Sequence, residues 1–194
     1  MLIGLTGKGG VGKDTIAHIL AESYGMRVMS LAAPLKELLL ELAPFIHVDG
    51  LPLSACLYHH TLEEVKREHP QAMRAVMRAL GGDSDGTAGA RKVFGHDFWI
   101  GELERRAESD LTDVVIPDIS FENEVRWLNR NGGVLFHVTR PGAHEIRVND
   151  GDITRHAQRL VTVANCGTRD DLRYKVVEAM DAAMKYDVRR PAFI

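Results

Sequence analysis

Hydrophobic positions along the chain fall into two alternating kinds of segment. Short, almost continuously apolar runs are typical of strands buried in a parallel sheet. These runs occupy residues 2–6, 26–33, 111–117, 134–139 and 161–164. Segments with an apolar residue at every third or fourth position are typical of amphipathic helices. They occupy residues 14–24, 34–43, 70–81, 97–108, 121–131 and 170–185. Gly25 stops the first of these helices, and Met184 is expected to face inward from the last. A shorter helix begins at Thr61, where residues 61–64 fit a capping box, and we expect residues 45–60 before it to be irregular. The alternation predicts an α/β fold in which helices flank a parallel sheet.

The junction between the first strand and the first helix carries the clearest motif. Residues 7–13 match the phosphate-binding loop G-x-x-x-x-G-K-[ST] up to its last place, where an aspartate replaces the hydroxyl residue. Glycines let several backbone N–H groups point at a phosphate, and the helix directs its positive end at the same anion. We therefore predict that ATP is bound by Gly7, Gly9, Gly10, Gly12, Lys13, Asp14 and Thr15.

Three oxygen-bearing residues are candidate ligands for Mg²⁺. The hydroxyl that Asp14 replaces normally binds the metal, and phosphate repels a carboxylate unless a cation lies between them. Asp14 would hold the metal directly or through water, and Thr15 is the alternative after a local shift of the chain. Asp118 follows the apolar run 111–117, and an acidic residue at the carboxyl end of such a strand lies in the ligand crevice. The other interpretation of Asp118 is a helix cap.

Basic residues are candidates to bind substrate phosphates. Arg74 and Arg78 are four positions apart and share one helix face, either as a solvated edge or as a pair of cations turned towards a substrate. Arg91 follows the glycine-rich segment 82–90, which we expect to be mobile. A mobile loop that delivers an arginine suits phosphoryl transfer, although a simple linker has the same composition. Arg140 follows the strand 134–139 and is a candidate ATP ligand on the crevice side.

Composition narrows the class of protein. With 194 residues, 45% hydrophobic and 26% charged, the chain suits one domain with a proper core. A net charge of -3 gives no reason to expect a nucleic acid or a membrane as partner. No apolar run approaches the roughly 20 residues that span a bilayer. No signal peptide fits, because the first residues already form the predicted strand, so we expect a cytoplasmic protein.

With these residues identified, the chain resembles the deoxynucleoside monophosphate kinases typical of tailed bacteriophages. No single block is highly specific, but the blocks follow the family order over most of the chain. They are Gly7-Lys8 with Gly12–Thr15, Ala32–Glu37, Arg74 with Leu80-Gly81, Arg91 with Asp97–Ile100, Asp118–Glu124, Gly132-Gly133 with Val138–Arg140, and His156. The aspartate after the loop lysine, followed by P-L-K-E and D-x-x-F-x-N-E, is much more specific than the loop alone.

The resemblance implies a P-loop fold with a helical substrate-binding insertion and a lid. The single kinase domain would span residues 1–194, with its core in 1–44 and 111–194 and the insertion at about 45–110. The implied reaction moves the γ-phosphoryl group of ATP to a deoxynucleoside monophosphate with Mg²⁺, in the host cytoplasm if the protein is phage-encoded. The small-molecule nucleotides would be its partners, with a homodimer as a further expectation.

The resemblance also assigns roles by position. Lys13 would hold the transferred phosphate, Lys36 and Arg74 would face the monophosphate, and Arg91 would be the lid arginine. With Asp118, Lys13 and Arg91 form the predicted catalytic set, and the predicted acceptor-binding residues are Lys36, Arg74, Arg78 and Arg91.

Four departures from the family pattern affect these assignments. The family's H-x-S-E element is here only His156-Ala157-Gln158-Arg159, so the base preference could differ from that of relatives. Alanine stands at position 33 where the family has aspartate, and Arg78 stands where it has glutamine. Ser120 replaces an arginine expected to stabilise the transition state, so Arg126, Arg140 or Arg78 would have to compensate. The sequence does not determine the preferred base or sugar.

Two other functions remain open. The lysine at position 8 also matches the deviant loop of partition and division-site positioning ATPases, which are nucleotide-switched binding proteins. Those proteins have threonine after the second lysine, unlike this chain. The second alternative is a kinase for another acceptor, such as dephospho-coenzyme A or a sugar. An inactive structural relative is the remaining interpretation.

Overall fold

The computed structural model describes residues 1–83, 86–108, 110–143 and 153–187. The chain divides into two compact units, which we call the sheet unit (Met1–Leu31 with Leu103–Ile194) and the helical unit (Ala32–Glu102). Each unit is described by itself. No helix in the described ranges has both the length and the apolar character needed to cross a membrane.

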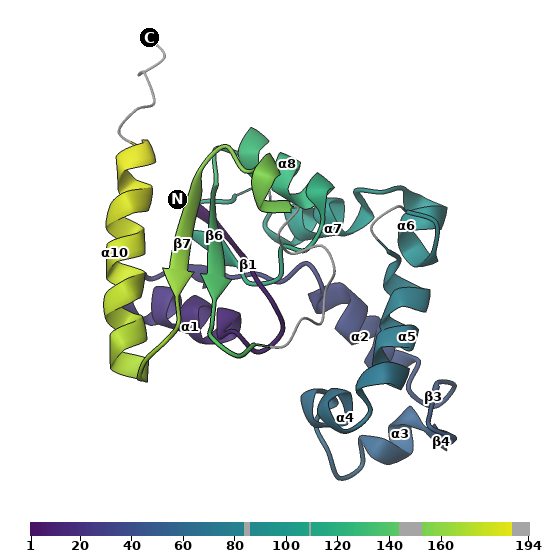
Figure 1. The fold of residues 1–194 in the computed structure, drawn as a ribbon. Helices are drawn as coiled ribbons and strands as arrows, with labels where there is room; N and C mark the ends of the chain where they lie inside the picture. The colour runs from purple at the N-terminus through teal and green to yellow at the C-terminus, as the bar shows by residue number, and fades with distance from the viewer. Residues whose placement is uncertain (84–85, 109, 144–152, 188–194) are drawn as a thin grey trace. The chain divides into compact units, whose positions relative to one another are not determined.

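The sheet unit is built on a five-stranded parallel sheet (Figure 1). Its strands are, in spatial order, β2 (Arg27–Val28), β5 (Val114–Ile116), β1 (Leu2–Thr6), β6 (Val134–Thr139) and β7 (Leu160–Ala164). Its helices are α1 (Lys13–Tyr24), α8 (Glu122–Arg130), the short 3₁₀ helix η1 (Thr154–His156) and α10 (Arg169–Asp187). The predicted α/β fold, a parallel sheet flanked by helices, is confirmed.

Helices cover both faces of this sheet because β1 is apolar on both sides. All five residues of β1 are buried, and the strand pairs with β5 on one side and β6 on the other. Ile3 and Leu5 pack with apolar residues of α1 and α10 in one core cluster. A Cβ on Gly4 would instead meet Ile119 and Leu128, so α8 lies on the opposite face. A central strand whose residues 2–5 have no polar side chain is thereby fixed at the middle of the sheet.

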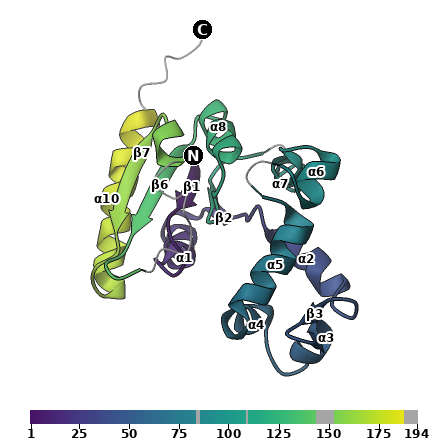
Figure 2. The ribbon, with the colours of Figure 1, turned by 45° about the vertical axis from the view of Figure 1, so that its right-hand side comes forward.

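The helical unit packs short helices around a separate core (Figure 2). Its elements are α2 (Ala33–Glu41), the antiparallel hairpin of β3 (His47–Val48) and β4 (Leu51–Pro52), α3 (Leu53–Cys56), α4 (Leu62–Glu68), α5 (Pro70–Gly81) and α6 (Gly89–Phe94). The boundary between the two units lies within α7 (Phe98–Arg106). α5 contacts α2, α4 and α6. The core cluster is Leu39, Ala43, Val48, Leu53, Val65 and Met73.

The capping box predicted at the start of α4 is confirmed. The Thr61 hydroxyl accepts a hydrogen bond from the Glu64 backbone N–H at 3.3 Å, and the Glu64 carboxylate accepts one from the Thr61 N–H at 2.7 Å. Two backbone donors that the helix itself leaves without partners are thus bonded. The local sequence alone determines this helix start.

Several predicted boundaries were wrong. The strand expected over 26–33 is only the two-residue β2, whose residues are exposed, because this edge strand pairs with β5 alone and α2 begins at Ala33. The stretch 45–60, expected to be irregular, contains the β3–β4 hairpin and α3. Met184, expected to face inward from α10, is 42% exposed.

Candidate functional site

The predicted phosphate-binding loop lies at the carboxyl edge of the sheet. Because all five strands are parallel, the segments that follow them emerge at the same edge (Figure 1). The loop 7–12 follows β1, Ser30 follows β2, Asp118 follows β5, Arg140 follows β6 and Asn165 follows β7. The sheet thus gathers the loop and two further candidate residues, Asp118 and Arg140, on one side of the unit.

The loop has the shape that only glycines permit at its two ends. Gly7 has a φ of 142°, and a Cβ there would overlap the backbone oxygen of Val138 at the end of β6. Gly12 has a φ of 100°, and its Cβ would lie 2.6 Å from the Asn165 side-chain nitrogen. Both the left-handed backbone and the close neighbours exclude a side chain. The carboxyl ends of β6 and β7 therefore shape the loop.

Lys13 lies in the first turn of α1, with its ammonium group against the loop. Its Nζ donates hydrogen bonds to the Gly7 carbonyl at 2.5 Å and the Lys8 carbonyl at 2.8 Å. Its side chain is half-buried. The cation is therefore held beside the backbone that the motif assigns to phosphate.

The N-terminus of α1 is open to an anion. Gly12 is the N-cap and offers no side-chain hydrogen bond, so the first N–H groups of the helix are not capped by it. Asp14 is exposed in the first turn and Thr15 is half-buried. An uncapped helix start with a glycine cradle and a lysine fits a polyphosphate.

The oxygen donors nearby fit a phosphate-bound Mg²⁺. Among the described residues, no group of three or more His, Cys, Asp and Glu side chains gathers to hold a metal ion. In nucleotide sites Mg²⁺ is bound by one or two carboxylates together with phosphate oxygens and water. The proposed ligands Asp14, Thr15 and Asp118 match this type of oxygen donor, and their role as ligands stays a prediction.

Asp118 connects the segments that follow β5 and β2. Its carboxylate accepts hydrogen bonds from the Ser30 hydroxyl at 2.7 Å and from the Leu31 N–H at 3.0 Å. The N-terminus of α8 is bonded by another residue: the buried Glu124 carboxylate accepts from the Ser120 N–H at 2.7 Å and the Phe121 N–H at 3.0 Å. Glu124 therefore performs the capping that sequence alone left open for Asp118.

Arg126 and Arg140, two candidates for the role of the arginine that the resemblance implies at position 120, differ in their surroundings. Arg126 forms an ion pair with Glu122 one turn away on α8 and is 62% exposed. The same Glu122 carboxylate lies 3.5 Å from His156 Nδ1. Arg140 is exposed directly after β6, at the carboxyl edge of the sheet. Within the sheet unit, Arg140 thus follows a strand at the loop edge, whereas Arg126 is paired along its own helix.

The predicted acceptor residues all lie in the helical unit. Lys36 Nζ donates to Glu63 Oε1 at 2.8 Å, and Lys66 binds the same carboxylate. Burial raises the pKa of Glu63, but the hydrogen bonds and charges of both lysines outweigh it and lower the pKa below its ordinary value. Arg74 Nε donates to the Pro70 carbonyl at 3.1 Å.

Arg78 and Arg91 are in opposite environments. Arg78 is 71% exposed and lies 3.6 Å from Asp83. Arg91 is only 4% exposed, and its Nη1 donates to the His96 carbonyl at 2.7 Å. The sequence led us to expect Arg91 directly behind a loop, but α6 already begins at Gly89 and includes it. Part of the glycine-rich segment, residues 84–85, lies outside the described ranges, and the role of Arg91 stays a prediction.

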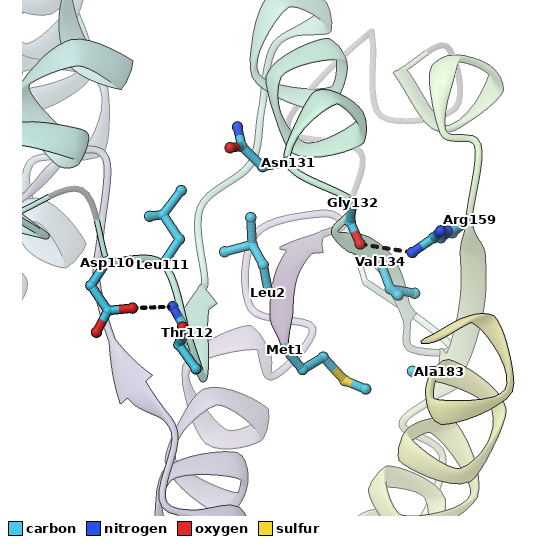
Figure 3. Close-up of a pocket in the computed structure, with 10 residues that line it drawn as sticks. All are labelled: Met1, Leu2, Asp110, Leu111, Thr112, Asn131, Gly132, Val134, Arg159 and Ala183. Atoms are coloured by element: carbon cyan, nitrogen blue, oxygen red, sulfur yellow. Dashed lines mark hydrogen bonds between the residues drawn. The ribbon is translucent and has the colours of Figure 1, made fainter. Parts of the chain in front are cut away.

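A cavity of about 390 Å³ in the sheet unit lies away from the loop (Figure 3). It is lined by Met1, Leu2 and Val134, which are at the amino ends of β1 and β6, the opposite edge of the sheet. Two polar residues of its lining have partners: Asp110 accepts from the Thr112 N–H at 2.8 Å, and Arg159 donates to the Gly132 carbonyl at 2.8 Å. The cavity is therefore not part of the phosphate site.

Sequence reasoning missed Asn165. This residue is buried, and its amide donates to the Val11 carbonyl at 2.8 Å. An asparagine after a short apolar run carries no local signal of such a contact, because the contact depends on β7 lying beside β6. Glu124 was read only as part of a motif, although its buried carboxylate organises the start of α8.

Comparison with known proteins links the chain to kinases. No protein-family model matches the chain. It is similar to a protein of Acanthamoeba polyphaga mimivirus whose provisional name is deoxynucleotide monophosphate kinase. The two are 26% identical over 192 residues, which cover 94% of this chain and 97% of the viral protein.

Solved structures with a similar backbone include a dephospho-CoA kinase from Campylobacter jejuni. It is 12% identical to this chain, the match covers 95% of this chain and 98% of that one, and the TM-score is 0.49. TT1252 from Thermus thermophilus is 18% identical over 94% of this chain and 96% of that one, with a TM-score of 0.47. A sugar kinase from Janibacter sp. HTCC2649 is 13% identical over 95% and 96%, with a TM-score of 0.40. At these TM-scores the likeness says nothing about what this chain binds. The viral relative supports the predicted relationship to kinases. It does not establish the narrower bacteriophage type or a specific acceptor.

Proposed function

We propose that this protein transfers the γ-phosphoryl group of ATP to a deoxynucleoside monophosphate, giving ADP and the diphosphate. The observation that carries the proposal is the glycine-shaped loop at the carboxyl end of β1, with the Lys13 ammonium group against it. The name of the viral relative, which is similar over nearly the whole chain, supports the choice of acceptor.

The residues of the loop would contribute to catalysis mainly by positioning the phosphates and by neutralising their charge. Phosphoryl transfer needs little covalent chemistry from the protein, but much neutralisation of charge in a fixed geometry. The backbone N–H groups of the loop and the start of α1 would bind the phosphate oxygens. Lys13 would exchange its bonds to the Gly7 and Lys8 carbonyls for bonds to the transferred phosphate.

Mg²⁺, when bound, would neutralise phosphate charge. Asp14 or Thr15, together with Asp118, would hold the ion through oxygen atoms. Asp118 already accepts two hydrogen bonds, from Ser30 and Leu31, so these bonds fix the orientation of its carboxylate. Arg140 is proposed to bind ATP at the same edge.

In this proposal the helical unit supplies the groups that bind the acceptor. Lys36, Arg74 and Arg78 would bind the monophosphate, and Arg91 would neutralise charge on the transferred group. Lys36 and Arg74 already donate hydrogen bonds to Glu63 and to the Pro70 carbonyl.

A coupled assay of ADP release tests the proposal. Purified protein is incubated with ATP, Mg²⁺ and each common ribo- and deoxyribonucleoside monophosphate in turn, with dephospho-coenzyme A and a set of simple sugars as further acceptors. We expect ADP release only when a deoxynucleoside monophosphate is present. Release without any acceptor would identify a switch ATPase, and release that needs dephospho-coenzyme A or a sugar would identify a different kinase. Lys13→Ala protein is the control for contaminating activity.

A further inference from the structure

Asn165 joins the carboxyl end of β7 to the middle of the phosphate-binding loop. Its side chain is nine-tenths buried, and its Nδ2 donates a hydrogen bond to the Val11 carbonyl at 2.8 Å across 154 positions of sequence. Its own backbone N–H donates to the Thr139 carbonyl at 2.8 Å, at the end of β6. The backbone of Asn165 is thus hydrogen-bonded to the sheet, and its side-chain amide extends from there to the loop.

This contact fixes the orientation of one peptide group in the loop. The carbonyl of Val11 and the N–H of Gly12 belong to the same planar trans peptide, so they point in opposite directions. Because Asn165 binds the carbonyl, the Gly12 N–H faces away from Asn165. The amide also stands where a side chain on Gly12 would be, since a Cβ there would lie 2.6 Å from Nδ2.

The contact also prevents the peptide from rotating. Gly12 has a φ of 100°, and glycine residues move between such conformations with little energetic penalty. Val11 has a buried side chain and Lys13 starts a helix, so both neighbours of Gly12 are held in place while its peptide depends on a single side-chain donor. Loss of the donor would leave a carbonyl without this partner and a peptide free to turn.

We propose that Asn165 is a positioning residue that presents the Gly12 N–H of the loop to the β-phosphate of a nucleotide. The inference rests on the proposed function only in that the loop binds nucleotide phosphates. Asn165 acts through the Val11–Gly12 peptide, and it has no contact with the transferred group in this role.

The test compares nucleotides that differ in their phosphates. Dissociation constants of ADP and AMP are measured by titration calorimetry, without any turnover, for the wild type and for Asn165→Ala. We expect the ADP dissociation constant to rise about tenfold, the size of one lost hydrogen bond, while that of AMP stays within about twofold. Asn165→Ser, which keeps a donor group, should recover part of the loss and also carries the test should the alanine variant fail to fold.

Asn129 provides a matched control. Its amide donates to the His156 carbonyl at 2.7 Å and accepts from the Gln158 N–H at 3.0 Å, so it also bridges two segments of the sheet unit. Asn129→Ala should lower the unfolding temperature without changing the ratio of the ADP and AMP dissociation constants. An unchanged ratio in Asn165→Ala, or in Asn165→Ser if only that variant folds, would overturn the inference. Failure of the wild type to bind ADP at all would instead contradict the proposed function.

Discussion

The phosphate-binding loop and the basic residues of the helical unit show two ways in which a site is encoded. In the loop, the reactive surface is backbone, and close neighbours fix its shape: Val138 behind Gly7 and Asn165 behind Gly12. In the helical unit, the candidate groups are side chains whose exposure ranges from 4% for Arg91 to 71% for Arg78. The comparison teaches that a glycine pattern predicts geometry directly, whereas a basic residue predicts only a charge.

The largest expected effect comes from the loop. Lys13→Ala should lower kcat/KM by about three orders of magnitude or more, because the transferred phosphate would lose the cation that the proposed function assigns to it. The measurement is the coupled ADP-release assay, together with circular dichroism to show that the fold is intact. Lys175→Ala, which removes an exposed lysine paired with Glu178 on α10, is the matched control. Near-normal turnover in Lys13→Ala would remove the loop from the mechanism.

The next effect tests whether the helical unit takes part in the reaction. Arg91→Ala should lower kcat by about two orders of magnitude, with a much smaller change in the ATP dissociation constant. Since its buried guanidinium donates to the His96 carbonyl, the variant should also lose about 1–3 kcal/mol of unfolding free energy. The kinetics of the wild type and of Arg91→Ala are therefore measured at a temperature at which urea titrations show that both are folded.

Arg67→Ala serves as the comparison for Arg91, because Arg67 is an exposed arginine on α4 of the same unit. It should change neither kcat nor stability appreciably. A normal kcat in Arg91→Ala, with stability reduced, would make Arg91 a purely structural residue and would separate the two regions in function as well as in structure.

A moderate effect concerns the metal. Asp14→Asn keeps the size of the side chain but removes its charge, so the Mg²⁺ concentration for half-maximal activity should rise by about tenfold. The measurement is a titration of turnover against Mg²⁺ at fixed ATP. Thr15→Val is tested in parallel, because it removes the alternative hydroxyl ligand. An unaltered titration in Asp14→Asn, with a shift in Thr15→Val, would assign the metal to Thr15.

The smallest expected effect is on stability, and it concerns one helix-capping carboxylate in each unit. Backbone and side-chain hydrogen bonds from Thr61 hold the pKa of Glu64 below its ordinary value of 4.5. Side-chain and backbone bonds from Thr168 hold the pKa of Asp171 below its ordinary value of 3.8. A depressed pKa in the folded state means that each carboxylate stabilises the fold above its ordinary pKa. That contribution is lost as the pH falls through the lower folded value.

Thr61→Ala should therefore destabilise the helical unit, and Thr168→Ala the sheet unit, at pH 7. Both differences should shrink as the pH falls through the folded pKa values of Glu64 and Asp171, to the part that comes from the hydrogen bond each hydroxyl accepts from a backbone N–H. The two tryptophans allow separate readouts in urea titrations, because Trp99 lies in the helical unit and Trp127 in the sheet unit. Single-tryptophan proteins made by Trp99→Phe and Trp127→Phe report each transition. A difference between variant and wild type that is as large at low pH as at pH 7 would contradict the assignment to these carboxylates.

Local sequence predicted the elements whose causes are local. The loop after β1, the end of α1 at Gly25 and the capping box at Thr61 each depend on residues within a few positions, and all three are present. The sequence also placed Asp118 at the end of a strand, where the structure has it. These are the features for which glycine conformation and capping chemistry leave little choice.

Features that depend on the order of strands escaped prediction. β2 is short because it pairs only with β5, and a nearly continuous apolar run conceals this edge position. The contact of Asn165 with Val11 requires that β7 lie next to β6, which no local pattern reveals. The burial of Arg91 also escaped prediction, although it does not depend on strand order. Arg91 was expected behind a flexible loop, but its burial depends on how α6 packs against α5.

The most direct test of the account is the transfer of a labelled phosphate. ATP that carries ³²P in its γ-position is incubated with the protein, Mg²⁺ and one deoxynucleoside monophosphate at a time, and the products are separated by chromatography. The account predicts that the label appears in a deoxynucleoside diphosphate with wild-type protein and is absent with Lys13→Ala. Label that remains in ATP with every monophosphate, or appears only as free phosphate, would contradict it.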